Sequence, residues 1–267
     1  MKKLATALVS AAAIMTMSTT AFAAENPAEV FDRVMEKNNT IQSAEIQSGV
    51  HSVILAKDVI PDGQMKVDMA MHAEMDMQDT TDLKYLAQVA SSILGQDSYS
   101  QVFYTDGYYY VDANGVKLKY PMPLEQIISS VQTGVNTSNM ESSYMKGISL
   151  NEVNGKRVLA YEANPKKLNK NVKEALGTVM NTLGTDVNLD MNIQEMKGAY
   201  VLDDNDYIIY MTNYIVYNME VLDQPMTCIT LMETEVQNPG EPVVVTLPST
   251  DGYEDLIGYT MESLKAK

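Results

Sequence analysis

This chain of 267 residues is 45% hydrophobic, which is enough for a packed core and too much for a disordered chain. Its net charge of -16 argues against a nucleic-acid partner, because such proteins need basic surface to displace counterions from phosphates. The single cysteine, Cys228, excludes a disulfide framework within the chain, and with only two histidines we expect no metal site and no cofactor.

Residues 1–23 have the features of a secretory signal peptide. Lysines at positions 2 and 3 precede an apolar, alanine-rich stretch, and Ala-Phe-Ala at residues 21–23 fits the small-x-small cleavage pattern. We therefore predict cleavage after Ala23 and export of the remaining chain, whose net charge is -18 because the removed segment carries two lysines and no acid. No cysteine lies near the cleavage site, so we expect no lipid anchor. The apolar stretch is short for a membrane span of about 20 residues.

The exported chain begins with a helix. Asn26 can cap it, Pro27 suits the first turn and Glu29 completes a capping box, which together predict a helix over residues 27–38.

A strand pair follows at residues 44–60 and 65–77, joined at the turn dipeptide Asp62-Gly63. In its second strand, seven of seven odd positions are apolar and five of six even positions are polar. The apolar positions are Met65, Val67, Met69, Met71, Ala73, Met75 and Met77. A period of two predicts one buried and one solvated face, as in antiparallel sheets.

The next elements alternate between helix and strand. Leu83, Leu86, Ala90 and Ile93 form one stripe at helical spacing, which predicts a helix over residues 81–94 with Gly95 as its stop. After it we expect a strand region at 100–112 with a turn at Asp106-Gly107. A strand at 116–120 follows the turn Asn114-Gly115, and a short helix begins at Pro123.

The second half repeats this style after a polar surface loop at residues 133–143. We expect strands at 144–152, 156–162, 187–202, 207–222, 226–237 and 243–247, with helices at 164–183 and 251–264. The fold class is therefore α+β, with one large antiparallel sheet of roughly ten strands that has to curl. Because neither half contains a complete sheet, we expect residues 24–267 to form a single domain.

The sequence carries no signature of an active site, so we expect no enzyme. It contains no Gly-rich phosphate loop, no His-Glu-x-x-His and no Ser in a Gly-x-Ser-x-Gly turn. His72 falls on the polar face of its strand, as a surface histidine does. The run at residues 203–206 has acidic side chains that could bind calcium, but it lacks the twelve-residue loop pattern and favours a plain hairpin turn.

The distinctive feature of the composition is 20 Met and 16 Tyr beside three Phe and no Trp. Methionine adapts to varied apolar partners, and tyrosine has an apolar body with a polar tip. We therefore interpret the inner strand faces as the wall of a deformable cavity for a lipid-like ligand. The residues predicted to line it are Met65, Met69, Met71, Met75, Met77, Tyr104, Met211 and Met219. The equal alternative is that these methionines simply fill an irregular core.

A second feature is a basic helix face in an acidic chain. Lys166, Lys170 and Lys173 share one face by their spacing, with apolar residues toward the other side. A solvated helix face is the plainer interpretation. The functional one is docking onto an anionic membrane surface, where each Lys contributes about 1 kcal/mol.

The chain resembles the bacterial lipoprotein-carrier (LolA/LolB-like) fold and the related mycobacterial LppX-type lipid-binding lipoproteins, and still more an uncharacterised group of exported Gram-positive proteins. The matching stretches are the N-terminal amphipathic helix, Met-Lys-Val-Asp-Met-Ala-Met at 65–71, Tyr-Thr-Asp-Gly-Tyr-Tyr-Tyr-Val-Asp at 104–112, and the strands of 191–217. The resemblance implies a curved antiparallel half-barrel, covered on its concave side by helices, with acyl chains held between the two. Many such proteins are lipid-anchored, and this chain lacks the N-terminal cysteine for that.

Two functions from different classes follow. The first is an exported, non-enzymatic binding protein for a lipid or another amphiphile. The second is a protein-interaction or sensory module of the cell envelope, which uses an exposed edge strand or the basic helix and holds no small ligand. An exported hydrolase is a distant third.

Overall fold

The computed structural model describes residues 25–56, 60, 62–79, 83–124, 126, 140–170, 191–221 and 224–256, which are predominantly β-structure. They form helix α2 (Pro27–Asn38), the short 3-10 helix η1 (Ser142–Tyr144) and a helical segment at 165–170. The first six strands are β1 (Ser43–Leu55), β2 (Gln64–Asp76), β3 (Lys84–Ile93), β4 (Gln96–Thr105), β5 (Tyr108–Ala113) and β6 (Val116–Pro121). The others are β7 (Met145–Val153), β8 (Lys156–Ala163), β9 (Met191–Leu202), β10 (Ile208–Val221), β11 (Gln224–Gln237) and β12 (Glu254–Asp255).

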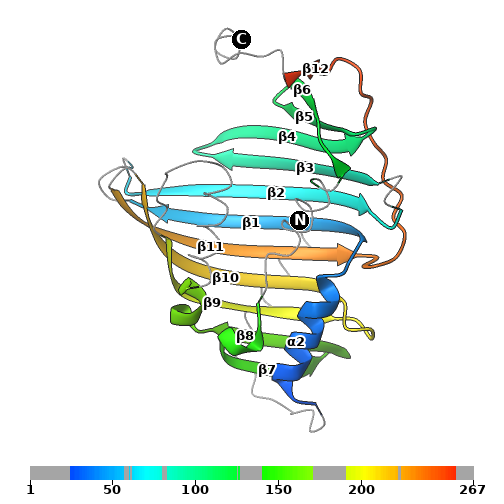
Figure 1. Cartoon of the computed structure of the whole chain (residues 1–267). Coiled ribbons are helices and arrows are strands. Elements are labelled where there is room, and N and C mark those ends of the chain that lie inside the picture. Colours follow the sequence, from blue (N-terminus) through cyan, green and yellow to red (C-terminus); the bar gives the residue numbers. More distant parts are fainter. Residues whose placement is uncertain are drawn as a thin grey trace. The chain divides into compact units, whose positions relative to one another are not determined.

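Hydrogen bonds join the strands in the order β12-β6-β5-β4-β3-β2-β1-β11-β10-β9-β8-β7 (Figure 1). The chain divides into two compact units, and β1 and β2 contribute residues to both. Unit 1 comprises Met1–Asn38, Gly49–Asp68 and Ser138–Glu235, and unit 2 comprises Asn39–Ser48, Met69–Thr137 and Val236–Lys267. The curved half-barrel, its helical cover and the single domain over residues 24–267 stay predictions.

Unit 1 is organised around the predicted N-terminal helix, which is confirmed as α2. The Asn26 side chain accepts a hydrogen bond from the Ala28 amide at 3.1 Å and donates to Glu29 at 3.1 Å, as expected for a helix start. One face of α2 buries four side chains against the antiparallel strands β7 to β10. The ring of Phe31 packs edge-on against Tyr161, with centroids 5.8 Å apart.

The far end of α2 is fastened to the turn between β9 and β10. Arg33 donates from Nε to Asp206 at 2.8 Å, and Asn38 accepts a hydrogen bond from the Ile208 amide at 2.9 Å. In the same turn, the Asp203 side chain accepts hydrogen bonds from the amides of Asn205 and Tyr207, each at 2.8 Å. The acidic run at 203–206 is therefore a hairpin turn. Its Asp203 carboxylate accepts hydrogen bonds from backbone amides, and its Asp206 carboxylate accepts them from arginines.

Unit 2 has apolar clusters on both faces of β3, β4 and β5. One cluster contains Met75, Met77 and Tyr104. The other contains Phe103 and Tyr110, whose stacked rings lie 4.6 Å apart and which both meet Tyr253 edge-on. The sheet of this unit is therefore covered on each side by apolar contacts.

The helix predicted over residues 81–94 is wrong, because residues 84–93 form strand β3. Its hairpin with β4 turns at Leu94 and Gly95, which have φ values of 52° and 75°. In β3, Ala87 belongs to one apolar cluster and Leu86 to the other. A strand buried on both faces loses the period of two, and its apolar residues then match a helical stripe by coincidence.

The C-terminal predictions also need correction. Residues 243–247 are not a strand but an irregular segment without ladder pairing, in which Val243, Val245 and Leu247 pack into the second cluster of unit 2 and Val244 is 89% exposed. Within the predicted helix 251–264, Glu254 and Asp255 instead form β12, which pairs in parallel with β6. Residues 257–264 of the predicted helix lie outside the described residues.

The hairpin turns at Asp106-Gly107, Asn114-Gly115 and Asn154-Gly155 are confirmed, and both residues of each have positive φ. In the first hairpin, the strand predicted over 44–60 ends at Leu55, and only Gly63 of the predicted turn has a positive φ. The helix predicted at 164–183 is helical over residues 165–170. Its remainder lies outside the described residues. So do most of the helix after Pro123 and most of the loop at 133–143.

Candidate ligand-binding site

Unit 2 places four tyrosines in register across four neighbouring strands. Tyr85 on β3 lies opposite Tyr104 on β4, which lies opposite Tyr109 on β5, which lies opposite Tyr120 on β6. We call this row the tyrosine ladder. At about 4.8 Å between strands, it extends over roughly 14 Å across the sheet. All four residues belong to, or pack against, the apolar cluster that contains Met75 and Met77.

The predicted residues of unit 2 differ in accessibility. Met75 is 2% exposed, Met77 3% and Tyr104 5%, so these three are members of the core. Met71 is half-buried and packs against the same cluster, whereas Met69 is 40% exposed. A ligand on this side of the sheet therefore meets Met71 before it meets the buried methionines. Whether any of them contacts a ligand stays a prediction.

Three hydroxyls of the ladder have no hydrogen-bond partner within the described part of the chain. Tyr104 donates to the Met122 carbonyl at 3.3 Å, but Tyr85, Tyr109 and Tyr120 make no such bond. Burial raises the pKa of Tyr85 and of Tyr120. Burial, and then the neighbouring phenols of Tyr85 and Tyr120, raises the pKa of Tyr109 further. These half-buried donors are neutral and available to an acceptor.

The other predicted lining residues lie in unit 1. Met211 packs against the cluster beneath α2, and Met219 is half-buried, with its sulfur accepting a contact from Cys228 Sγ at 3.7 Å. Met65 is also half-buried. Cys228 itself is buried, as predicted for a small apolar side chain. The eight predicted residues are thus divided between the two units.

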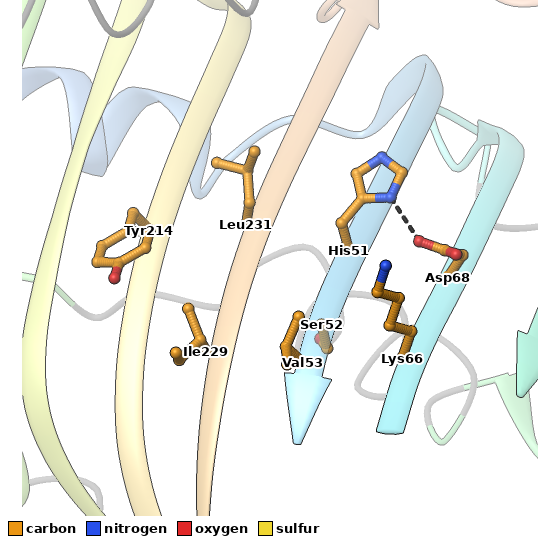
Figure 2. Close-up of a pocket in the computed structure, with 8 residues that line it drawn as sticks. All are labelled: His51, Ser52, Val53, Lys66, Asp68, Tyr214, Ile229 and Leu231. Carbon is orange, nitrogen blue, oxygen red and sulfur yellow. Dashed lines mark hydrogen bonds and ion pairs between the residues drawn. The ribbon is translucent and has the colours of Figure 1, made fainter. Parts of the chain in front are cut away.

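Unit 1 also contains a pocket of about 300 Å³, which we call the unit 1 pocket (Figure 2). Its apolar side consists of Val53 on β1, Ile229 and Leu231 on β11, and the ring of Tyr214 on β10. Tyr214 lies opposite Leu231 in the ladder of β10 and β11. Because Met211 faces α2 and side chains alternate along a strand, Tyr214 points to the opposite face of unit 1.

The polar side of the unit 1 pocket comes from β1 and β2. His51 Nδ1 lies 2.7 Å from Asp68 Oδ1, and the ammonium group of Lys66 completes this side. In Figure 2 the His51, Lys66 and Asp68 side chains gather at one end, and Ser52 points away behind its strand. Ser52 is instead hydrogen-bonded to Thr230 at 2.9 Å.

Of the basic helix face, Lys166 and Lys170 are exposed, and Lys173 lies outside the described residues. Across the described ranges, no group of three or more His, Cys, Asp or Glu residues could hold a metal ion. Nor is any helix in that part of the chain long and apolar enough to cross a membrane.

Sequence reasoning missed the ladder and the unit 1 pocket. Tyr85 was assigned to a helix, so its register with Tyr104 could not be seen. The pocket joins β1 and β2 to strands more than 140 residues later. A signal was present in β11, where Ile229 and Leu231 are apolar on the same face on which Glu233 and Glu235 follow.

The described residues define an antiparallel-sheet protein with one docked N-terminal helix and two partly exposed apolar surfaces. The chain belongs to the "Family of unknown function (DUF6612)", whose model matches residues 26–248. No protein with a curated description is detectably similar to it in sequence. Its placement among exported Gram-positive proteins stays a prediction.

Several solved structures are similar to this chain at low identity. LprF from Mycobacterium bovis is 10% identical, with 84% of this chain and 97% of that chain covered and a TM-score of 0.37. A beta-barrel-like protein of the domain of unknown function DUF1849 from Brucella abortus is 11% identical, with 74% and 100% covered and a TM-score of 0.25. The ywiB protein from Bacillus subtilis is 10% identical, with 75% and 96% covered and a TM-score of 0.21. Similarities at this level carry no inference about a ligand.

Proposed function

We propose that this protein is an exported, non-enzymatic binding protein for a lipid or another amphiphile, and that the ligand lies on the tyrosine ladder of unit 2. The observation that supports the proposal is the row of Tyr85, Tyr104, Tyr109 and Tyr120. The side-chain hydroxyls of three of them have no hydrogen-bond partner among the described residues. The proposal assigns no catalytic step.

The chemistry of the ladder suits an amphiphile. Its rings and the adjacent Met71 provide apolar contact area, and methionine adapts its shape to different partners. The phenol groups of Tyr85, Tyr109 and Tyr120 lose part of their hydration without gaining an acceptor, which costs free energy. A ligand with ester, carboxyl or headgroup oxygens would supply that acceptor while its apolar part covers the rings.

The test is binding of N-phenyl-1-naphthylamine, an uncharged dye that becomes fluorescent in apolar surroundings. We expect saturable binding to the mature chain and displacement by fatty acids. Met71→Asp should weaken the dye at least tenfold, because a carboxylate on this surface must be desolvated when the dye binds. Met226→Asp, at a half-buried methionine of unit 1, is the matched control and should bind as the wild type does.

Tyr120→Asp provides a second variant in case Met71→Asp fails to fold, and circular dichroism checks both. No saturable binding by the wild type would overturn the proposal. Equal affinity of the two folded ladder variants and the wild type would overturn the assignment to the ladder.

Export is part of the proposal and has its own test. Expression of the full chain in a bacterial host should give a processed protein that begins at Ala24, as read by N-terminal sequencing. A protein that retains residues 1–23 would contradict the signal peptide, and a lipid-modified one would contradict the absence of an anchor.

We also propose that the basic helix face docks on anionic membranes. Lys166 and Lys170 are exposed and make no ion pair within the described chain, so their charges are available to lipid headgroups. The mature chain should float with vesicles containing phosphatidylglycerol and not with phosphatidylcholine vesicles. The double variant Lys166→Glu, Lys170→Glu should lose flotation. Equal flotation with both vesicle types would contradict docking by charge.

A further inference from the structure

We propose that the unit 1 pocket is a separate binding site for a small amphiphilic carboxylate, whose anionic group pairs with Lys66 and whose apolar part lies on Ile229 and Leu231. The pocket belongs to unit 1 and opens on the face opposite α2. It is therefore distinct from the tyrosine ladder of unit 2, and its existence does not depend on the function proposed for the ladder.

The face of β11 that lines the pocket carries apolar side chains that are only half-buried. Along β11, Glu233 and Glu235 occupy the same face as Ile229 and Leu231, because side chains alternate with a period of two. The face thus changes from acidic to apolar within one strand. Ile229 and Leu231 remain partly exposed and are lined up with Val53 on the neighbouring strand. These half-buried apolar side chains form the apolar side of a concave pocket with polar groups at its other side, which is the usual composition of a ligand site.

The polar side of the unit 1 pocket carries charged side chains. Asp68 is already engaged by His51 at 2.7 Å, whereas Lys66 has no ion pair within the described part of the chain. Of the two charged groups in the pocket, Asp68 has a hydrogen-bond partner and the ammonium of Lys66 has none among the described residues, so Lys66 is the group with donors left for a ligand. A ligand carboxylate would accept a charge-assisted hydrogen bond from Lys66.

The volume of the unit 1 pocket limits the size of its ligand. A volume of about 300 Å³ is at the lower end of the range for small-molecule pockets. The ring of Tyr214 closes one side of the pocket. The ammonium of Lys197, on the neighbouring strand β9, lies 5.0 Å from the centroid of this ring and stabilises its position. The pocket therefore suits a compact apolar group, such as a medium-length chain or one aromatic ring, joined to a single carboxylate.

The experiment is a titration of the mature chain, labelled at its Ile, Leu and Val methyl groups, with octanoate and in parallel with 1-octanol. We expect octanoate to shift the methyl signals of Ile229, Leu231 and Val53 with an affinity at least tenfold tighter than that of octanol. Lys66→Met should reduce the affinity for octanoate at least fivefold without changing that for octanol. Lys156→Met, which removes an exposed lysine from another strand of unit 1, is the matched control and should have no effect.

Absence of shifts at all three methyl groups would overturn the site. Equal affinities for octanoate and octanol, or an unchanged affinity of folded Lys66→Met for octanoate, would overturn the role of Lys66. Labelling the methionine methyl groups in the same sample separates the two sites, because Met71 reports on the ladder. Shifts at Met71 alone would support the ladder and contradict the unit 1 pocket.

Discussion

Tyr109 on β5 lies directly opposite Tyr120 on β6, with ring centroids 5.5 Å apart and ring planes inclined by 49°. The two phenols are half-buried, and neither has a hydrogen-bond partner in the described chain. Neither hydroxyl is fully buried, but the surrounding side chains displace part of its hydration and raise its pKa. A ligand acceptor at these hydroxyls would replace the hydration that is lost.

The ladder predicts an unusual response to removal of a hydroxyl. Tyr109→Phe keeps the ring contacts and removes the half-buried donor, so the free energy of unfolding should stay the same or rise by up to about 1 kcal/mol. Urea unfolding measures it. The control is Tyr104→Phe, which loses its bond to the Met122 carbonyl and should be destabilised by about 1 kcal/mol. Equal losses in both variants would mean that Tyr109 has an acceptor of its own.

The fastening of α2 predicts a dependence on pH. Burial pushes the pKa of Asp206 upward, but hydrogen bonds from Arg33 and Arg157 outweigh it and hold the pKa below its ordinary value of 3.8. A carboxyl whose pKa is lowered by folding stabilises the native state above its unfolded pKa, and the contribution is lost as the pH falls through the folded pKa. Asp206→Asn should therefore cost about 1.5–3 kcal/mol at pH 7.

The difference between wild type and Asp206→Asn should shrink once the pH falls below about 3.8, as measured by urea unfolding across this range. Asp204→Asn, at an exposed neighbour in the same turn, should leave stability unchanged at both pH values. A difference for Asp206→Asn that stays constant down to pH 2 would contradict the ion-pair explanation.

Neighbouring atoms in unit 1 lie so close to Gly198 that we expect no larger residue to be tolerated there. A Cβ added at Gly198 on β9 would lie 2.5 Å from the Thr212 carbonyl oxygen and 2.9 Å from the Tyr161 hydroxyl, and it would also clash with Asn213 Oδ1. The Tyr161 hydroxyl donates to Asn213 at 2.5 Å, so the added methyl group disturbs a buried pair. Gly198→Ala should lower stability by about 1–3 kcal/mol.

Gly147→Ala on β7 is the control for thermal unfolding, since nothing lies within 4 Å of its added Cβ. It should leave the melting temperature within a degree or two of the wild type. Equal melting temperatures for the two variants would show that Gly198 is not confined as described.

The turn between β3 and β4 provides a test that distinguishes the observed strand β3 from the helix predicted for the same residues. Leu94 has a φ of 52° and is 70% exposed, and a leucine is strained in this left-handed conformation. Asparagine tolerates it and precedes glycine well in such a turn. Leu94→Asn should therefore raise the free energy of unfolding by about 1 kcal/mol. A helix ending at residue 94 would instead be weakened by the change, so a lowered stability would contradict the hairpin.

Sequence patterns predicted the strands that have one apolar and one polar face. They failed for strands that are apolar on both faces. Residues 65–77 alternate because one face is polar, and the strand β2 was found. Residues 84–93 have Leu86 in one apolar cluster and Ala87 in the other, so no alternation marks them. The turn dipeptides at 106–107, 114–115 and 154–155 were predicted correctly because their positive φ depends on the two residues themselves, whereas at Asp62-Gly63 only the glycine has a positive φ.

The candidate site was less accessible to sequence reasoning. The choice of Met75 and Met77 correctly identified an apolar face, but these side chains are buried in its core, and Met71 is the one at its margin. The ladder depends on the register of four strands, which no local pattern specifies. The unit 1 pocket depends on the neighbourhood of β1 and β11, whose pairing is between residues far apart in sequence.

Native mass spectrometry tests whether this protein binds an amphiphile on the tyrosine ladder. Protein comprising residues 24–267 is incubated with a total bacterial lipid extract, separated from free lipid and measured, and the ligand is then identified after organic extraction. The account predicts a defined amphiphile bound in a fixed ratio to the wild type and to Met226→Asp, and lost from Met71→Asp. Only unliganded protein in all three samples, with no binding of the apolar dye, would contradict it and favour an envelope interaction module instead.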